Sequence, residues 1–315
     1  MDELLRASVI IPTYNRADDL VKCLAALAQQ TVAPQTFEIL VVDNASTDHT
    51  ATVVQTFAEA HPELCVRYVV ESRQGAGYAR NRALMETQGS VLCFLDDDAV
   101  ANPAWLERLL VGFVDPSVGC VGGPAIPDYQ GRERPAWLAG DLQGLLSGYV
   151  LPYTQPTVVM ICAEFPFACN MALRRSLFET ISGFRPDLDR VGRQLLTGGE
   201  TELIGRVQQA DWKVIYLPEA HVRHLVAPDR LAKDYIFRIG HGIALSHMIR
   251  TTDGRLLMAL RWFASDIWHT IRLFVLFCTA VLARKPLWYD DYVRFWIVAL
   301  RVPYRVRLLL RRELT

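Results

Sequence analysis

The chain has 315 residues, hydrophobic residues make up 51% of it, and its formal net charge is −1. This length allows one large or two modest domains with a sizeable core, and the composition excludes a disordered chain. The near-neutral charge excludes a protein that binds nucleic acid through its overall charge. Seven cysteines lack CxxC or Cys/His metal spacing, and Met1–Arg6 is not a signal peptide, so we expect reduced thiols and a cytoplasmic setting.

The first ninety-five residues alternate between two patterns. Short apolar runs that suit buried strands are followed by segments with helical periodicity. Four such alternations imply an α/β fold with a mostly parallel sheet and helices on its faces. The expected strands are Ala7–Pro12, Phe37–Val42, Val66–Val70 and Val91–Leu95, and the expected helices are Asp18–Gln30, a helix ending at Glu59, and Gly75–Gln88.

Polar residues follow three of these strands, at Asn15, at Asp43 and at Asp96–Asp98. Parallel strands end at the same edge of a sheet, and open α/β sheets bind ligands at that edge. Three consecutive carboxylates repel one another, and a divalent cation that carries a diphosphate would remove this conflict. The alternative is a solvated acidic turn. We expect a single ligand site at this edge.

Four segments together resemble the motifs of family 2 glycosyltransferases in order and spacing. They are Val9–Arg16, Val41–Asp48, Gly75–Asn81 and Phe94–Asp98. The resemblance covers roughly residues 7–226. It implies a GT-A fold over residues 1–226, a nucleotide-diphosphate-sugar donor, a divalent metal (Mn²⁺ or Mg²⁺), and inversion at the anomeric carbon.

The resemblance also implies roles for individual residues on the donor side. Asp43 would accept a hydrogen bond from the base, although it could instead be a turn residue. Arg80 would lie near the diphosphate, to which its charge and fork geometry are suited, although it could be a solvated helix charge. The implied donor-binding residues are Pro12, Thr13, Tyr14, Asp43, Arg80, Asn81, Asp96 and Asp97.

The same resemblance implies a metal site. Asp98 would bind the cation, and Asp96 would assist it while holding ribose or sugar hydroxyls. His224, in the segment after the last expected strand, Trp212–Pro218, would complete the carboxylate site with an imidazole. A surface histidine is the alternative for His224.

A general base is expected near the second diagnostic block. Family members commonly show two adjacent acids here and another two positions later, whereas this chain has Gly199 at the first acid position. We assign the base to Glu200 and keep Glu202 as the second candidate. A positioned carboxylate can take the proton of an attacking acceptor hydroxyl. Glu200 could also be an acid that favours a helix N-terminus.

The acceptor side is expected in two segments. Residues 122–156 contain eleven glycines and prolines, and long loops of this kind are usually functional. Trp137 in this stretch could stack on an acceptor sugar or lipid carrier, or it could pack the loop down. Asn170 lies in Phe165–Arg175, which resembles the family's stretch before the acceptor-side helix, although Cys169 stands where glycine is more usual.

Residues 227–315 have helical patterns and an excess of bases near the end. The apolar stretch Leu256–Ala283 contains Arg261, Asp266 and Arg272, and each charge would cost on the order of 3 kcal/mol at a bilayer centre. We therefore expect peripheral contact with the cytoplasmic face of a membrane and a saccharide or lipid-linked acceptor. A packed helical hairpin and a dimer interface are the alternatives.

Three other functions are alternatives to a glycosyltransferase. Degenerate carboxylates would favour a non-catalytic scaffold of the same fold, and this chain keeps Asp96, Asp98 and Glu200. A sugar-nucleotide nucleotidyltransferase would need a glycine-rich basic loop where Pro12–Asn15 stands. A dinucleotide oxidoreductase would need a glycine fingerprint that Gly75–Gly77 does not provide. The sequence leaves the donor sugar, the acceptor and the oligomeric state open.

Overall fold

The computed structural model describes residues 6–138, 140–190, 195–251, 256–285 and 288–312. The chain divides into two units. The first comprises Met1–Gln130, Ser147–Asp187 and Gly199–Val226, and the second comprises Gly131–Leu146, Leu188–Gly198 and Ala227–Thr315.

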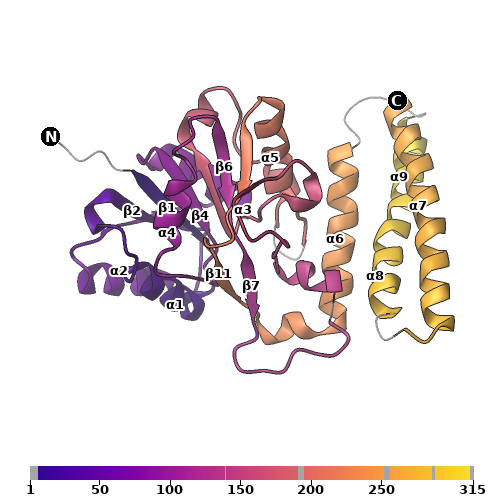
Figure 1. Cartoon of the computed structure of the whole chain (residues 1–315), viewed down its shortest axis with the longest axis horizontal. Helices are drawn as coiled ribbons and strands as arrows, with labels where there is room; N and C mark the ends of the chain where they lie inside the picture. Colours follow the sequence, from indigo (N-terminus) through magenta and orange to yellow (C-terminus); the bar gives the residue numbers. More distant parts are fainter. Residues whose placement is uncertain (1–5, 139, 191–194, 252–255, 286–287, 313–315) are drawn as a thin grey trace. The chain divides into compact units, whose positions relative to one another are not determined.

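An eight-stranded mixed sheet forms the centre of the first unit, with helices packed on it (Figure 1). The strand order is β3-β2-β1-β4-β9-β6-β10-β8. The strands are β1 (Ala7–Thr13), β2 (Phe37–Asp43), β3 (Cys65–Val70), β4 (Val91–Leu95), β6 (Val118–Gly122), β8 (Thr157–Val158), β9 (Asn170–Arg174) and β10 (Lys213–Tyr216). The helices are α1 (Ala17–Leu27), α2 (Thr50–Ala60), α3 (Ala76–Glu86), α4 (Trp105–Val111) and α5 (Gly199–Gln209).

The four strands expected from the apolar runs are confirmed within one or two residues. Every residue of β2 and β4 is buried, as expected for strands covered on both faces. β3, at the edge of the sheet, is largely exposed or half-buried along its length. The pairings among β1, β2, β3 and β4 are all parallel.

β9 departs from the expected pattern. Asn170 was expected to precede a helix, but it begins a strand that lies antiparallel between β4 and β6. In this register Asn170 is opposite Leu95. The segment that contains Cys169 is thereby carried next to the end of β4, where the carboxylates begin.

A second, three-stranded sheet was not expected from the sequence. It has the order β5-β11-β7, with β5 (Ala99–Ala101), β7 (Ala125–Asp128) and β11 (Val222–Leu225). β11 runs antiparallel to β5, so that His224 is opposite Ala99. The Leu225 N–H also donates a 2.7 Å hydrogen bond to the main-chain oxygen of Asp98. This sheet therefore fixes His224 beside the carboxylates.

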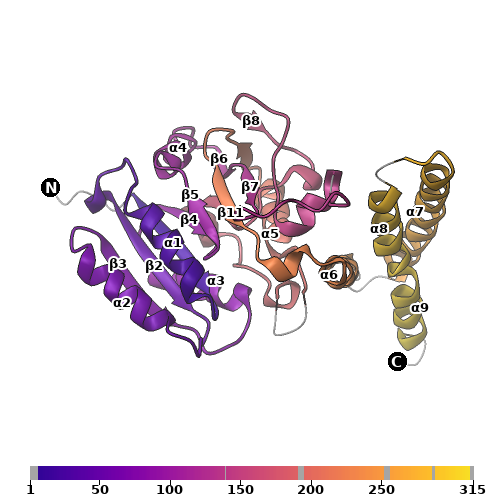
Figure 2. The same ribbon diagram turned by 90° about the horizontal axis from the view of Figure 1, so that it is seen from below.

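Helices alone make up the described part of the second unit beyond residue 227. They are α6 (Lys233–Thr251), α7 (Leu256–Leu282), α8 (Trp288–Ala299) and α9 (Arg301–Arg312), together with the short 3-10 helix at Pro228–Leu231. α7, α8 and α9 are drawn in the yellow tones of Figure 2. Asp266 of α7 is buried and accepts a hydrogen bond from Arg305 of α9, and Arg301 lies 3.7 Å from the same carboxylate.

Candidate active site

The ends of β1, β2 and β4 lie side by side, because β1 pairs in parallel with both of the other strands. Thr13 is opposite Asp43 in this register. The Thr13 hydroxyl donates a 2.8 Å hydrogen bond to Asp97 Oδ2, which joins the end of β1 to the carboxylates after β4. The predicted meeting of the three polar clusters at one edge is thus confirmed.

Arg16 forms ion pairs with two of the three consecutive carboxylates. Its Nη1 lies 3.1 Å from Asp97 Oδ1 and 2.5 Å from Asp98 Oδ2, and both acids are buried. Burial raises the pKa of Asp97 to about 6, with Arg16 opposing the shift and Asp98 adding to it. Arg16 had no predicted role, although an arginine in the loop after β1 was a usable signal.

Asp96 points away from this pair toward Arg80. The Arg80 Nη2 lies 3.3 Å from Asp96 Oδ1, and the guanidinium lies 5.6 Å from the centre of the Phe184 ring. Arg80 is only 6% exposed, which excludes the alternative that it is a solvated helix charge. The Asp96 side chain is 29% exposed, which makes it the most accessible of the three consecutive carboxylates.

Asn15 connects the loops that follow β1 and β2. Its φ of 52° lies in the left-handed region, which asparagine tolerates better than most residues. Its Oδ1 accepts a 2.7 Å hydrogen bond from the Thr47 N–H, and its own N–H donates to Ser46 Oγ at 2.9 Å. Of the neighbouring residues, Tyr14 is 46% exposed and Pro12 is half-buried.

Asp43 is buried in the turn after β2. Its Oδ1 accepts a 2.8 Å hydrogen bond from the Ser46 N–H, and its Oδ2 accepts one from the Tyr68 hydroxyl. These are the contacts of a turn residue, and its contact with a nucleotide base stays a prediction. Asn44, which was not singled out from the sequence, donates to the main chain of Glu71 and accepts a 2.7 Å hydrogen bond from the Gly75 N–H.

Asp96, Cys169 and His224 form a group suited to a metal ion. One ligand atom from each lies within 4.8 Å of those of the others. His224 is 1% exposed, and its Nδ1 has no hydrogen-bond partner among the described residues. A buried unsatisfied nitrogen is costly, and a cation would satisfy it. The Nε2 lies 3.1 Å from Asp98 Oδ1, an arrangement typical of a metal-binding histidine oriented by a carboxylate. These residues therefore fit a divalent cation.

The two candidate bases differ in their surroundings. Glu202 is held by Arg206, whose Nη2 lies 2.8 Å from Glu202 Oε2 and whose Nε donates to both carboxylate oxygens at 3.0 and 3.1 Å. Glu200 is half-buried in the first turn of α5. Burial, assisted by the charges of Asp96, Asp98 and Glu200, raises the pKa of the Cys169 thiol well above its usual range. Glu200 is thus within electrostatic reach of Cys169, one of the three potential metal ligands.

The side chains of Asn81 and Asn170 brace the main chain. Asn81 donates to Phe184 O at 2.8 Å and accepts from Phe184 N at 2.7 Å. Asn170 is 1% exposed; it accepts a 2.7 Å hydrogen bond from Trp105 Nε1 and donates to Pro124 O and Ala220 O. The predicted contacts of Asn81 with the donor and of Asn170 with the acceptor stay predictions.

Trp137 belongs to the second unit, unlike the other predicted site residues. Its ring is half-buried and meets the Tyr289 ring edge-on, with 5.5 Å between the ring centres. Lys233 Nζ lies 5.9 Å from the centre of the Trp137 ring. These contacts agree with the packing alternative for Trp137, and its contact with an acceptor stays a prediction.

The comparison with known families identifies the protein family of this chain. The profile of "Glycosyl transferase family 2" matches residues 8–182, more than half of the chain. The chain belongs to glycosyl transferase family 2. It is therefore a glycosyltransferase by family, which sets aside the alternatives of a nucleotidyltransferase and an oxidoreductase.

Named members of the family share parts of this chain. Glycosyltransferase AglE of Haloferax volcanii is 39% identical over 37% of the chain, and the match covers 38% of that relative. The glucosyl-dolichyl phosphate glucuronosyltransferase of the same organism is 24% identical over 74% of this chain and 73% of its own. The O-antigen chain rhamnosyltransferase RfbN of Salmonella typhimurium is 27% identical over 70% of this chain and 66% of its own.

Solved structures support the GT-A fold. The mannosyltransferase PcManGT from Pyrobaculum calidifontis, in complex with GDP-Man and Mn²⁺, matches with a TM-score of 0.65 at 20% identity, over 95% of this chain and 87% of that one. S. aureus TarS 1–349 in complex with UDP-GlcNAc matches with a TM-score of 0.55 at 20% identity, over 96% and 83%. The fold class expected from the sequence is confirmed.

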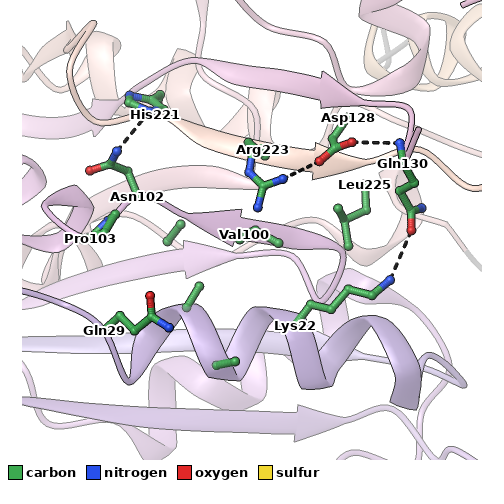
Figure 3. A pocket seen from close by; sticks show the side chains of 13 residues that line it. Lys22, Gln29, Val100, Asn102, Pro103, Asp128, Gln130, His221, Arg223 and Leu225 are labelled. Atoms are coloured by element: carbon green, nitrogen blue, oxygen red, sulfur yellow. Dashed lines mark hydrogen bonds and ion pairs between the residues drawn. The ribbon is translucent and has the colours of Figure 1, made fainter. Parts of the chain in front are cut away.

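A cavity of about 600 Å³ lies elsewhere in the first unit, between α1 and the three-stranded sheet (Figure 3). Figure 3 shows Lys22 pointing to Gln130, Arg223 pointing to Asp128, and Asn102 pointing to His221. None of the predicted site residues lines this cavity. Lys22, Asn102 and Arg223 are thus paired with other residues of the lining, and we assign no function to the cavity.

Proposed function

We propose that this glycosyltransferase moves a sugar from a nucleotide-diphosphate-sugar to a saccharide or lipid-linked acceptor hydroxyl with inversion at the anomeric carbon. The observation that carries the proposal is the cluster of potential metal ligands at the carboxyl end of β4, made of Asp96, Cys169 and His224. Asp96 and His224 belong to the group of potential ligands, and Glu200 acts electrostatically on the thiol of the same group.

On the donor side, the proposed contacts are those implied by the family motifs. A cation held by Asp96, Asp98 and His224 would offset the charge that grows on the leaving diphosphate. Arg80 lies beside Asp96 and can supply two parallel hydrogen bonds to phosphate oxygens. Mn²⁺ or Mg²⁺ is the proposed cation, which is supported by the Mn²⁺ in the PcManGT complex.

On the acceptor side, Glu200 would take the proton of the attacking hydroxyl. A bond forms between the acceptor oxygen and the anomeric carbon while the bond from that carbon to the diphosphate oxygen breaks. Glu202 is less suited, because Arg206 engages both of its oxygens and also donates to the main chain of Ser182 and Gly183. A carboxylate fixed in this way would have to leave its partner before it could accept a proton.

The experiment for this proposal uses the full chain, Mn²⁺ and the nucleotide-sugar that binds it best. NMR of the transferred glycoside, whose anomeric configuration is fixed, shows whether the configuration is inverted. We expect the configuration opposite to that of the donor. Retention would contradict the inverting mechanism, and the absence of turnover with every donor and acceptor tried would contradict the proposal as a whole.

We further propose that the second unit attaches the enzyme to the cytoplasmic face of a membrane. One stretch among the described residues, Leu260–Leu282, is long and apolar enough to cross a bilayer by length and composition, and only 11% of its most apolar window is buried. At about 100° per residue, eight of the nine large apolar side chains described as exposed on α7 fall in a stripe about 140° wide. The eight are Leu260, Ile267, Trp268, Ile271, Phe274, Val275, Val281 and Leu282, whereas Leu276 lies outside the stripe.

The charges of this region are arranged differently from what the sequence suggested. Asp266 is turned inward to Arg305 and Arg301, so it adds no charge to the stripe, and those two arginines are unavailable for lipid phosphates. Arg261 and Arg272 are exposed and fall beside the stripe. An apolar stripe flanked by arginines is typical of a helix that lies in a membrane interface. A lipid-linked acceptor, as in the name of the glucosyl-dolichyl phosphate relative, is consistent with this location.

Substitution of two residues of the stripe tests this attachment. Trp268 is 65% exposed and Ile271 is 55% exposed, so Trp268→Glu/Ile271→Glu should fold normally. Each side chain contributes on the order of 2 kcal/mol when it is buried, so binding to anionic vesicles should weaken by more than about tenfold. The measurement is vesicle co-sedimentation at low and high salt.

The matched control is Val114→Glu, which changes another exposed apolar residue, 80% exposed, in the first unit. It should leave vesicle binding unchanged. Equal binding by the wild type and the double variant would contradict the proposed attachment. Resistance of the wild type to carbonate extraction would show that α7 spans the membrane rather than lying on it.

A further inference from the structure

The thiol of Cys169 is an unusual member of the metal-binding group. Cys169 is 2% exposed and directly precedes β9, whose antiparallel pairing with β4 brings it to Asp96. Its sulfur lies within 4.8 Å of a carboxylate oxygen of Asp96 and of a ring nitrogen of His224. Oxygen ligands suit Mg²⁺ and Mn²⁺, whereas a thiolate selects softer cations.

The second observation is the imidazole of His224. Its Nδ1 is buried and has no hydrogen-bond partner among the described residues, while its Nε2 lies 3.1 Å from Asp98 Oδ1. A metal-binding histidine almost always directs its other nitrogen to a carboxylate or carbonyl. Nδ1 is therefore the atom that is left for a cation, and Asp98 is the group that orients the ring.

We propose that Cys169 is a metal ligand and that Asp96, Cys169 and His224 form a site for a thiophilic divalent cation such as Zn²⁺ or Cd²⁺. This site occupies the same position as the Mn²⁺ or Mg²⁺ of the proposed function. The inference rests on that function only in sharing this position. On binding, the thiol loses its proton to solvent and the thiolate sulfur bonds to the metal. Zn²⁺ thus competes with Mn²⁺ or Mg²⁺ for Asp96 and His224.

The dimensions of the group are compatible with this ion. Zn²⁺ binds sulfur at about 2.3 Å and nitrogen or oxygen at about 2.0–2.2 Å, so three ligands of a tetrahedral site stand roughly 3.3–3.6 Å apart. The group, whose ligand atoms lie within 4.8 Å, needs to contract by little more than an ångström. Three protein ligands leave the fourth position for water or a diphosphate oxygen, as in zinc sites with an open position.

The experiment is a titration of the full chain with CdCl₂, followed by thiolate-to-metal charge-transfer absorption in the ultraviolet. Cys65 and Cys162 are exposed, so both are first changed to serine to remove surface binding. In this background we expect a band that saturates at one Cd²⁺ per chain. Cys169→Ser should abolish the band and weaken Zn²⁺ binding by at least about tenfold, while the thermal shift produced by Mn²⁺ remains.

Cys120→Ser is the matched control, because Cys120 is also a buried thiol but does not belong to the group. It should retain the band. Absence of the band in the background chain, or its persistence in Cys169→Ser, would overturn the inference. Should Cys169→Ser not fold, His224→Gln gives the same decision, since the band must then weaken through the loss of the second ligand.

The test also separates this inference from the proposed function. Mn²⁺-dependent binding of a nucleotide-sugar without a Cd²⁺ band would overturn the role of Cys169 and leave the transferase mechanism intact. A Cd²⁺ band that requires Cys169, in a chain that shows no metal-dependent donor binding, would support the ligand role and contradict the proposed use of a hard cation.

Discussion

Glu200→Gln is expected to lower the rate of sugar transfer by roughly 10²–10⁴, the usual contribution of general acid–base catalysis. This corresponds to about 3–5 kcal/mol of transition-state stabilisation. The substitution keeps the shape of the side chain but removes the group that accepts the acceptor's proton. Glu200 is half-buried at the start of α5 and glutamine has nearly the same size, so the fold should be retained. Initial rates at saturating donor, with donor affinity from thermal shift, provide the measurement.

Glu202→Gln is the matched control for the base. Glu202 lies two residues after Glu200 in the same helix and is paired with Arg206, which also donates hydrogen bonds to the main-chain oxygens of Ser182 and Gly183. Its loss should reduce stability more than catalysis. Normal transfer by Glu200→Gln together with a large loss in Glu202→Gln would move the base to Glu202. A loss of donor affinity in Glu200→Gln would instead argue that Glu200 serves the donor side.

Asp98→Asn is expected to weaken Mn²⁺ and metal-dependent donor binding at least tenfold and to lower turnover by about 10² or more. The carboxylate lies 3.1 Å from His224 Nε2, so it orients that imidazole even before any direct contact with the cation. Changing such a partner typically costs 10–100-fold in metal affinity, and loss of a direct ligand costs more. Calorimetric titration with Mn²⁺ and turnover with and without EDTA measure the effect.

The main chain at Asp98 is held independently of its carboxylate, because its carbonyl oxygen accepts a hydrogen bond from the Leu225 N–H. The folded structure should therefore survive the substitution, with Arg16 still paired to Asp97. Asp115→Asn, which changes a surface carboxylate paired with Lys213, is the control and should leave metal binding unchanged. Full activity and unchanged metal dependence in Asp98→Asn would remove Asp98 from the metal site.

The sequence predicted what depends on long apolar runs and on motif spacing. β1, β2, β3 and β4 were found because buried parallel strands are continuous apolar segments. The short strands β5, β7 and β11 have three or four residues each and carry no readable period. The meeting of Asn15, Asp43 and Asp97 at one edge followed from the parallel order. The antiparallel placement of β9, and with it the position of Cys169, did not.

Pairings between distant residues were also beyond the sequence. Arg16 belongs to the motif segment Val9–Arg16, but only the packed loop shows that it is paired with both Asp97 and Asp98. Three adjacent acids suggested that a cation was needed, and the chain supplies part of that charge itself. Asp266 was read as a charge that makes crossing of a bilayer costly, yet it is buried inside the helical unit, where it pairs with Arg305, thirty-nine positions away. Charge patterns along a helix do not report which side each charge faces.

The most direct test of the account is a thermal-shift screen of the full chain with UDP-, GDP- and dTDP-sugars, each with Mn²⁺ and with EDTA. A ligand that binds only the folded state raises the free energy of unfolding by mass action, and the melting temperature rises with it. At a ligand concentration of a hundred times the dissociation constant, the gain in stability is about 2.7 kcal/mol. We predict that at least one nucleotide-sugar stabilises the wild type in Mn²⁺, and that EDTA or Asp98→Asn abolishes the shift. Equal stabilisation in EDTA would contradict the metal site, and no stabilisation by any nucleotide-sugar would contradict the donor class.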